Sequence, residues 1–412
     1  MENDQFMNTY IRCTHSPHKR SSVLGSISGL SAILSLIVVL AYTPSAIAKK
    51  GKSKRGKSLA VAAPLMSLSP PALSAEHQEM LRGVRPDPAP PEIVRNSHYW
   101  VSNEHNHQLW YQSVDGIGGA LIGVGTDQNY LLAGWARSTL LILMDFDEKI
   151  PVIHEIYAYM FAVSATPEEF LKRWTRSYHD DSAEKLSAHF MALIEPEARR
   201  EARDKGLGEA QSKRYIQRRV NRFVKERVNI YKLTRGLLWR RLSKTKKKYI
   251  KLNLPTFLSD QDQYDHIRSL WAGGRVLAIR GDLTADYTML DIATALTSLG
   301  ESLNILYLSN AEQYFKLPPT YRRNIIAQPW GDRSVALRTM GWGILGFFDE
   351  DEQYHYNVQP GLNFVTWMKG SRTTKAGRML LRGREIKEPG FSVMTGLPRK
   401  SKRLPTIAPL PK

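Results

Sequence analysis

Four segments in strict alternation constrain the fold of this chain more than any other feature. Residues 120–124 (ALIGV) and 139–144 (TLLILM) have the length and composition of short buried strands. Residues 126–136 follow the first run and residues 149–163 follow the second, and both predict helices. Strand, helix, strand and helix within about 45 residues predict right-handed, parallel βαβ topology.

The same alternation returns in the second half of the chain. Residues 275–279 and 303–308 predict two further buried strands, with a helix over 287–299 between them. A chain of 412 residues with 42% hydrophobic side chains is long and apolar enough to enclose a core around such a sheet. We therefore expect an α/β fold with a mostly parallel sheet.

A basic helical insertion, placed at 176–253, separates the two halves of the predicted sheet. The helical region opens at Thr166, and Pro167 and Glu169 complete the pattern of a helix N-terminus. Between residues 199 and 251 there are 20 Lys and Arg against four acids, so this stretch holds +16 of the formal charge of +19. Such charge indicates an anionic neighbour: nucleic acid, an acidic membrane face or an anionic envelope polymer.

Aromatic and aliphatic side chains interleave with these basic residues. This pattern is typical of a helix that lies in a membrane interface. The alternative is a solvated helical excursion that packs its apolar groups on the body of the protein. The side chains concerned are Tyr215, Phe223, Ile230, Leu237, Leu238 and Trp239.

The N-terminal residues 1–48 predict a signal peptide or a membrane anchor. Residues 21–42 carry no charge and are long enough to span a bilayer as one helix. Ala46 and Ala48 fit a signal-peptidase site, which predicts export. The charges sum to +1 before the apolar run and +6 after it, which by the positive-inside rule predicts a body on the cytoplasmic side. The sequence leaves the side of the membrane open.

Segments of biased composition flank the predicted α/β domain, which we place at 97–365. Residues 49–96 alternate basic and Pro/Ala/Ser stretches and predict a disordered linker. Within it, residues 51–58 match the phosphate-binding pattern G-x-x-x-x-G-K-S, but Pro64 follows in place of a helix, so we interpret them as a basic tether. Residues 366–412 are basic and end in prolines, which predicts a loosely ordered tail.

The glycine turn after the first strand is the main candidate for a binding site. Gly123 and Gly125 let the backbone approach a nucleotide-like ligand closely, at a strand end where open α/β sheets bind ligands. Asp145 follows the next strand, 20 residues after Gly125, where a carboxylate can accept hydrogen bonds from a ribose diol. The alternative is a turn that serves only helix–sheet packing, since Asp127 stands where a third glycine would help.

Further polar residues at strand ends predict the walls of a pocket. Asp282 follows the third strand, and the run Ser309–Tyr314 (SNAEQY) follows the fourth. His154, one turn into its helix, is a candidate proton-transfer group or, alternatively, a core histidine with its hydrogen bonds satisfied. Residues 102–107 (SNEHNH) are rich in ligand side chains but lack a metal-binding spacing, so we expect no metal site.

In their order and spacing, these residues resemble a family of poorly characterised bacterial proteins described as having an S-adenosylmethionine-dependent-methyltransferase-like fold. The resemblance covers about 97–175 and 254–345. Its most specific parts are the octapeptide Gly123–Tyr130 and the run Tyr307–Tyr314. Shorter matches are Ser102, Asn103, Glu104, Asp145, His154, Gly281 and Asp282.

The resemblance implies a Rossmann-like, mostly parallel sheet of methyltransferase type, with S-adenosylmethionine as cofactor, and it identifies no catalytic residue. The implied cofactor-binding residues are Gly123, Gly125, Asp127, Gln128, Asn129, Asp145 and Asp282. The residues expected to face the substrate are Ser309, Asn310, Glu312, Gln313, Tyr314, His154 and Glu104.

Two functions remain as hypotheses. The first is a membrane-targeted or exported methyltransferase-like protein that binds a nucleoside-type ligand at the Gly123–Gly125 turn. S-adenosylmethionine is cytosolic, so a body outside the membrane would lack this cofactor. The second is a non-catalytic, envelope-associated protein that docks on an anionic surface through the basic helices of 199–251. Nucleic-acid binding fits the charge but has no recognition motif in this sequence.

Overall fold

The computed structural model describes residues 69–93, 97–345, 353–399 and 404–411. The predicted signal peptide or anchor at 1–48 and the tether at 51–58 lie outside these residues. None of the helices in the described part of the chain combines the length and the apolar character that a membrane crossing needs.

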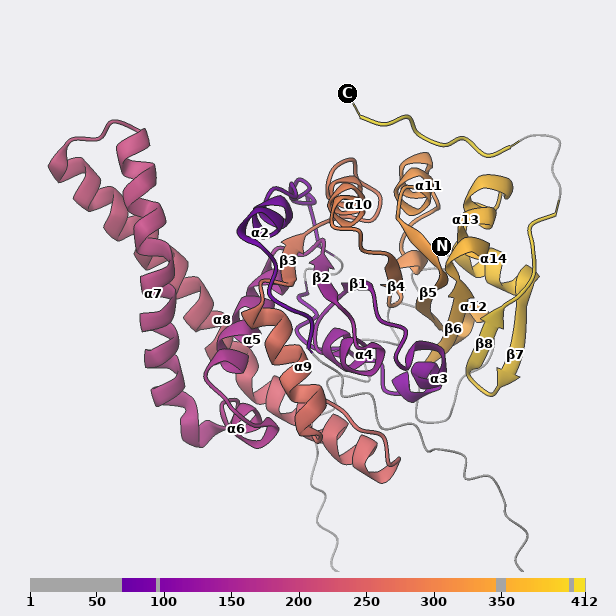
Figure 1. Ribbon diagram of the computed structural model, residues 1–412, viewed down its shortest axis with the longest axis horizontal. Helices are drawn as coiled ribbons and strands as arrows, with labels where there is room; N and C mark the ends of the chain where they lie inside the picture. Colours follow the sequence, from indigo (N-terminus) through magenta and orange to yellow (C-terminus); the bar gives the residue numbers. More distant parts are fainter. Residues whose placement is uncertain (1–68, 94–96, 346–352, 400–403, 412) are drawn as a thin grey trace, which may run out of the picture. The chain divides into compact units, whose positions relative to one another are not determined.

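One sheet of eight strands, in the order β3-β2-β1-β4-β5-β6-β8-β7, forms the centre of the fold (Figure 1). The first five strands of this order are mutually parallel, whereas β6 is antiparallel to β5 and β7 is antiparallel to β8. The prediction of an α/β fold with a mostly parallel sheet is confirmed, and the four predicted strands are β1 to β4. The strands are β1 Ala120–Val124, β2 Leu140–Asp145, β3 Val276–Arg280, β4 Leu303–Tyr307, β5 Trp330–Gly341, β6 Tyr354–Pro360, β7 Arg384–Glu388 and β8 Phe391–Met394.

The apolar runs become central strands because both faces of the sheet are covered. Successive side chains of a strand point to opposite faces. In β2, Leu141 and Leu143 therefore enter one core, whereas Ile142 and Met144 enter the other. Strands buried on both sides need a continuous apolar run rather than alternation, which is why TLLILM predicts its strand well.

Helices cover the sheet on both faces. In Figure 1, α10 and α11 lie above the strands and α4 and α9 lie below them. The helices on the face of Leu141 are η2 His107–Trp110, α3 Tyr111–Val114, α4 Gln128–Ala136, α5 Lys149–Ala162, α6 Pro167–Lys172 and α9 Gln261–Ala272. Those on the face of Ile142 are α2 Ala75–Arg82, α10 Thr288–Ser298, η4 Ala311–Gln313, α11 Pro319–Ile326, α12 Trp342–Leu345, α13 Gly361–Gly370 and α14 Ala376–Gly383.

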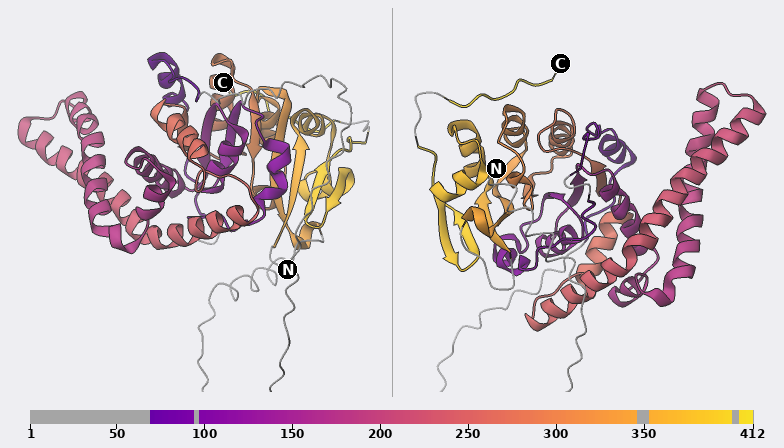
Figure 2. Two further views of the ribbon diagram at one scale, coloured as in Figure 1. Left: turned by 60° about the horizontal axis from the view of Figure 1, so that its bottom comes forward. Right: turned by 180° about the vertical axis from the view of Figure 1, so that it is seen from behind.

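The basic insertion forms a helical hairpin. After η3 (Arg176–Tyr178), α7 spans His179–Asp204 and α8 spans Glu209–Lys251. Figure 2 shows the two helices side by side, extending beyond the helices that cover the sheet. Phe190 of α7 packs edge-on against Phe223 of α8, with ring centroids 6.0 Å apart. The predicted helix start is also confirmed, since Thr166 accepts a hydrogen bond from the N–H of Glu169 (3.2 Å) as N-cap of α6.

Two segments that we expected to lack order contain regular structure. Much of the predicted tail forms the end of α13, α14 and the strands β7 and β8. In the predicted linker, Ser74 caps α2 and Leu81 of that helix is buried. In α14 the basic residues lie on the exposed side, whereas Met379 and Leu380 are buried. A basic composition averaged over the segment hid this amphipathic spacing.

Candidate functional site

The glycine turn and Asp145 meet at the carboxyl edge of the sheet. The strand order reverses between β1 and β4, and open α/β sheets bind ligands at such a point. Because β1 and β2 are neighbours, the N–H of Gly125 reaches Asp145 Oδ2, to which it donates a hydrogen bond (3.1 Å). The structure therefore joins the two parts of the predicted ligand site.

Two amide side chains, Gln128 and Asn129, lie against the glycine turn. Both donate hydrogen bonds to the carbonyl oxygen of Val124, at 3.0 and 3.1 Å. A Cβ at Gly123 would lie 1.9 Å from Asn129 Oδ1. Gly125 has a φ of +82°, and a Cβ there would lie 2.6 Å from Gln128 Nε2. Both glycines thus make room for amides of the chain itself, at the place where a ligand would approach the backbone.

An irregular stretch of chain crosses the carboxyl edge, and we call its residues 85–93 and 97–107 the covering segment. It begins at β3, where the buried Asp87 accepts a hydrogen bond from the N–H of Asp282 (2.9 Å). The other carboxylate oxygen of Asp87 accepts from two N–H groups at the start of α10, at 3.0 and 3.2 Å. The carboxylate of Asp282, predicted to contact a cofactor, accepts hydrogen bonds from the N–H and the hydroxyl of Thr284 (2.7 and 2.8 Å).

The covering segment then follows the spatial order of the strands. Next to the end of β2, His98 Nδ1 lies 2.6 Å from Asp147 Oδ2. After β1, the N–H of Ser102 donates to Asp127 Oδ1 (2.8 Å). At β6, Tyr356 accepts hydrogen bonds through its hydroxyl from the N–H groups of residues 105 and 106 (2.9 and 2.8 Å). The segment thus occupies the edge at which such sheets usually hold ligands.

Glu104 anchors the middle of the covering segment. Its fully buried carboxylate accepts hydrogen bonds from the hydroxyls of Tyr307 (2.6 Å), Ser309 (2.6 Å) and Thr339 (2.7 Å). Burial opposes ionisation, but the contacts with His107, Ser309 and Tyr307 hold the pKa of Glu104 below its ordinary value. An ionised carboxylate therefore joins the covering segment to β4 and β5.

Arg241 of α8 connects the basic insertion to this edge. Its buried guanidinium donates to Asp127 Oδ2 (2.8 Å), to the carbonyl of Glu104 (2.8 Å) and to His105 Nδ1 (2.8 Å). Despite the burial, Arg241 keeps the pKa of Asp127 below its ordinary value. The pKa of His105 falls to about 4 because of burial and the charges of Arg241 and Lys244, so this ring is a neutral acceptor. Asp127, which breaks the glycine pattern, is thus the ion-pair partner of the insertion.

The remaining residues predicted to face a substrate lie in separate environments. Glu312 forms a fully buried ion pair with Arg338 (2.5 Å). Gln313 accepts a hydrogen bond from the N–H of Gly341 (3.1 Å), whereas the side chain of Tyr314 is 51% exposed. Asn310 donates to the hydroxyl of Tyr354 (3.3 Å). Of the SNAEQY run, Ser309 is the residue that donates a hydrogen bond to Glu104.

His154 is a buried histidine with both ring nitrogens hydrogen-bonded. Its Nε2 donates to the carbonyl of Gly125 (2.9 Å), and its Nδ1 accepts from the hydroxyl of Tyr130 (2.9 Å). Burial lowers the pKa of His154 to about 4. The ring therefore stays neutral and holds the glycine turn through its hydrogen bond to the carbonyl of Gly125.

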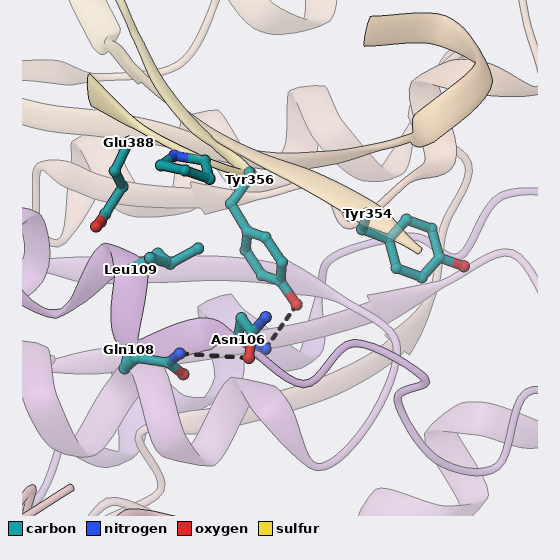
Figure 3. Close-up of a pocket in the computed structure, with 8 residues that line it drawn as sticks. Asn106, Gln108, Leu109, Tyr354, Tyr356 and Glu388 are labelled. Atoms are coloured by element: carbon teal, nitrogen blue, oxygen red, sulfur yellow. Dashed lines mark hydrogen bonds between the residues drawn. The ribbon is translucent and has the colours of Figure 1, made fainter. Parts of the chain in front are cut away.

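A cavity of about 280 Å³ lies beside the far end of the covering segment (Figure 3). Tyr356 stands at its centre, and Asn106 Oδ1 accepts a hydrogen bond from Gln108 Nε2 (3.3 Å). No residue that the sequence predicts for a site lines this cavity. Its lining residues are Asn106, Gln108, Leu109, Tyr354, Tyr356, Glu388, Pro389 and Gly390. Across the described residues, no three His, Cys, Asp or Glu side chains gather closely enough to hold a metal ion.

The fold and this edge define an α/β protein that covers the carboxyl edge of its sheet with its own chain. A family described as "Domain of unknown function (DUF7790)" matches residues 99–396, and the chain belongs to this family. The matched range includes all eight strands together with α7 and α8. No curated protein matches the sequence.

Sequence reasoning missed the residues that close this edge. Asp87 lies in a proline-rich stretch whose composition predicts no contact. Arg241 is one of 20 cations between 199 and 251, and its only signal is helical phase. It lies 14 residues after the buried Arg227, which is about four helical turns, so both point to the packed side of α8.

Replacing Arg241 should destabilise the fold strongly. Arg241→Met leaves Asp127 buried and unpaired, so we expect the free energy of unfolding to fall by about 3–5 kcal/mol in urea titrations. Arg241→Met with Asp127→Asn should recover much of the loss. The neighbouring, exposed Arg240 is the matched control, and Arg240→Met should stay within about 0.5 kcal/mol of wild type. Equal losses from the two arginines would show that the buried pair is unimportant.

Asp145 should give the stability a pH dependence of its own. Burial raises the pKa of Asp145 from 3.8 to about 7, so the folded state binds a proton that the unfolded state has released. This carboxyl therefore contributes a loss of stability as the pH rises from about 4 to 7. Compared with wild type in urea titrations across this range, Asp145→Asn should become relatively more stable as the pH rises. Parallel pH profiles would contradict the raised pKa.

Proposed function

We propose that this protein docks on an anionic bilayer through the exposed side of α8, with the α/β fold as its scaffold. The observation that carries the proposal is a row of nine exposed cations along this helix, spaced by three, four, seven or eight residues. We call them the basic face of α8. They are Arg214, Arg218, Arg222, Lys225, Lys232, Arg240, Lys244, Lys247 and Lys251.

The basic face is without acidic partners among the described residues. The ion pairs of α8 use cations on its other sides, namely Arg219, Arg227, Arg241 and Lys246. Glu226, one of two acids in the helix, pairs with Lys149 of α5. The ion pairs that hold α8 to the rest of the protein thus use other cations, and the nine exposed cations are left unpaired. This arrangement supports a role in binding an external anion.

Exposed apolar side chains on the same side favour a bilayer over nucleic acid. Leu233 is 70% exposed, Trp239 43% and Ile250 55%, and they stand between the cations of the basic face. Ile230 and Leu238, by contrast, are buried on the packed side. Aliphatic groups find no partner on a phosphate backbone but gain free energy at the boundary between headgroups and acyl chains.

The length of the basic face also suits an extended surface. From Arg214 to Lys251 the helix rises about 56 Å at 1.5 Å per residue. Each Lys or Arg close to an anionic leaflet contributes about 1 kcal/mol, so the row supplies strong attraction that weakens as salt is added. The covered carboxyl edge further supports a scaffold, because the covering segment and Arg241 occupy the usual ligand site.

Reversing two charges of the basic face should weaken binding to anionic vesicles. For the full chain with Lys232→Glu and Lys247→Glu, we expect affinity in sedimentation assays to fall by on the order of tenfold or more. Arg82→Glu with Arg333→Glu, an equal charge change at exposed sites elsewhere, is the matched control and should bind like wild type. Trp239→Ser should also weaken vesicle binding. Unchanged binding of the Lys232/Lys247 variant, or tighter binding of wild type to duplex DNA, would refute the docking role.

A second function, binding of a nucleoside-type ligand, is favoured by the contact between Gly125 and Asp145. The order β3-β2-β1-β4-β5 is that of doubly wound, nucleotide-binding sheets, and the resemblance to methyltransferases makes S-adenosylmethionine the ligand we propose. Asp145 is only partly buried and lies where a ribose diol would donate hydrogen bonds. Gln128 and Asn129 would have to leave the turn to admit it.

Calorimetry on the full chain tests this second function directly. Wild type should bind S-adenosylmethionine at millimolar concentration, and Asp145→Asn should weaken the binding because one of the two acceptor oxygens becomes a donor NH2 group and the negative charge is lost. Asp147→Asn, two residues further on, is the matched control, since Asp147 faces His98 and the start of α5. Absence of binding to wild type would exclude the ligand, whatever the vesicle assays show.

A further inference from the structure

We infer that the protein bridges two anionic bilayers, because a second basic surface lies on the opposite side of the sheet from α8. This inference rests on the proposed docking function of α8. Between residues 353 and 384 there are six Lys and Arg and no Asp or Glu. Five of the six are exposed, and we call these the α14 surface: Lys369, Arg372, Lys375, Arg378 and Arg382.

Helical phase places three of the five cations on the exposed side of α14. Lys375, Arg378 and Arg382 follow one another at spacings of three and four along α14. The opposite side of this helix buries Met379 and Leu380 in the core. Lys369 lies in the last turn of α13, and Arg372 lies in the link between the two helices. The α14 surface thus consists of exposed cations from two consecutive helices and the link between them.

The α14 surface has the same chemistry as the basic face of α8. None of its five cations forms an ion pair with another described residue, and only Arg382 has a side-chain hydrogen bond there, to Thr373 Oγ1 (3.1 Å). Leu381, between two of the arginines, is 54% exposed. Unpaired cations beside an exposed aliphatic side chain again fit the anionic boundary of a bilayer.

The two basic surfaces face away from each other. Tyr231, Leu238 and Leu242 of α8 pack into the core on the face of Leu141, whereas Met379 and Leu380 of α14 pack into the core on the opposite face. α8 also contacts α5, which packs on β2 and β3, while α14 lies near the other end of the strand order. In Figure 1, α8 runs from the left side of the fold to below the sheet, whereas α14 lies beside β6 and β8. One flat bilayer cannot contact both, so two bilayers are joined.

Clustering of anionic vesicles by the full chain tests the bridge, with light scattering as the readout. Lys375→Glu with Arg378→Glu should still sediment with vesicles but should cluster them on the order of tenfold more slowly. These positions are the N-cap and the third residue of α14, where acids favour a helix, so the fold should be retained. The Arg82→Glu, Arg333→Glu protein is the control of equal charge and should cluster vesicles like wild type.

The outcomes separate the bridge from the docking function. If wild type binds vesicles without clustering them, or if the Lys375/Arg378 variant clusters them at the wild-type rate, the bridge is refuted and docking stands. If Lys232→Glu with Lys247→Glu leaves vesicle binding unchanged, the docking function fails first. If the α14 surface joins vesicles to duplex DNA instead of to other vesicles, the second bilayer is refuted. Loss of clustering with binding retained supports the bridge.

Discussion

The ion pair of Arg241 with Asp127 joins three parts of the chain that lie far apart in the sequence. Arg241 belongs to the basic insertion and Asp127 to the turn after β1, while the other two partners of Arg241, Glu104 and His105, belong to the covering segment. A buried pair is stable only when further hydrogen bonds satisfy both ions. Here the backbone N–H of Ser102 donates a further hydrogen bond to Asp127. The guanidinium donates to two acceptors besides the carboxylate, so both ions have their hydrogen bonds satisfied. Loss of this ion pair would therefore destabilise the insertion, the sheet and the covering segment together.

The glycine turn shows how one local pattern serves two kinds of site. A glycine is needed where a neighbouring group comes too close for a Cβ, and the group need not be a ligand. At Gly123 the group is the amide of Asn129, and at Gly125 it is that of Gln128. Both residues lie within the octapeptide that carries the resemblance to methyltransferases. The turn thus keeps the spacing of a nucleotide site while its own side chains fill the approach.

How far the sequence predicts this structure depends on the range of each interaction. The four central strands and the start of α6 could be predicted because apolar spacing and capping are local signals. The tail could not, because the few apolar residues of α14 are diluted by cations. The contact between Arg241 and Asp127 spans 114 residues, and no local feature names Asp127 as the partner. Glu312 follows a strand closely, as pocket residues do, yet the fold turns it toward Arg338 in the core.

Helical phase divides the cations of α8 into two sets, and the exposed set argues for a partner. Arg227 and Arg241 point to the packed side, and each forms an ion pair with a carboxylate there. The exposed cations include six pairs at spacings of three or four, such as Arg214 with Arg218 and Lys244 with Lys247. Like charges at these spacings destabilise a helix by about 0.2–0.5 kcal/mol each, or about 1–3 kcal/mol for the row. Fastening the covering segment requires none of them, whereas an anionic surface removes their repulsion and turns it into attraction.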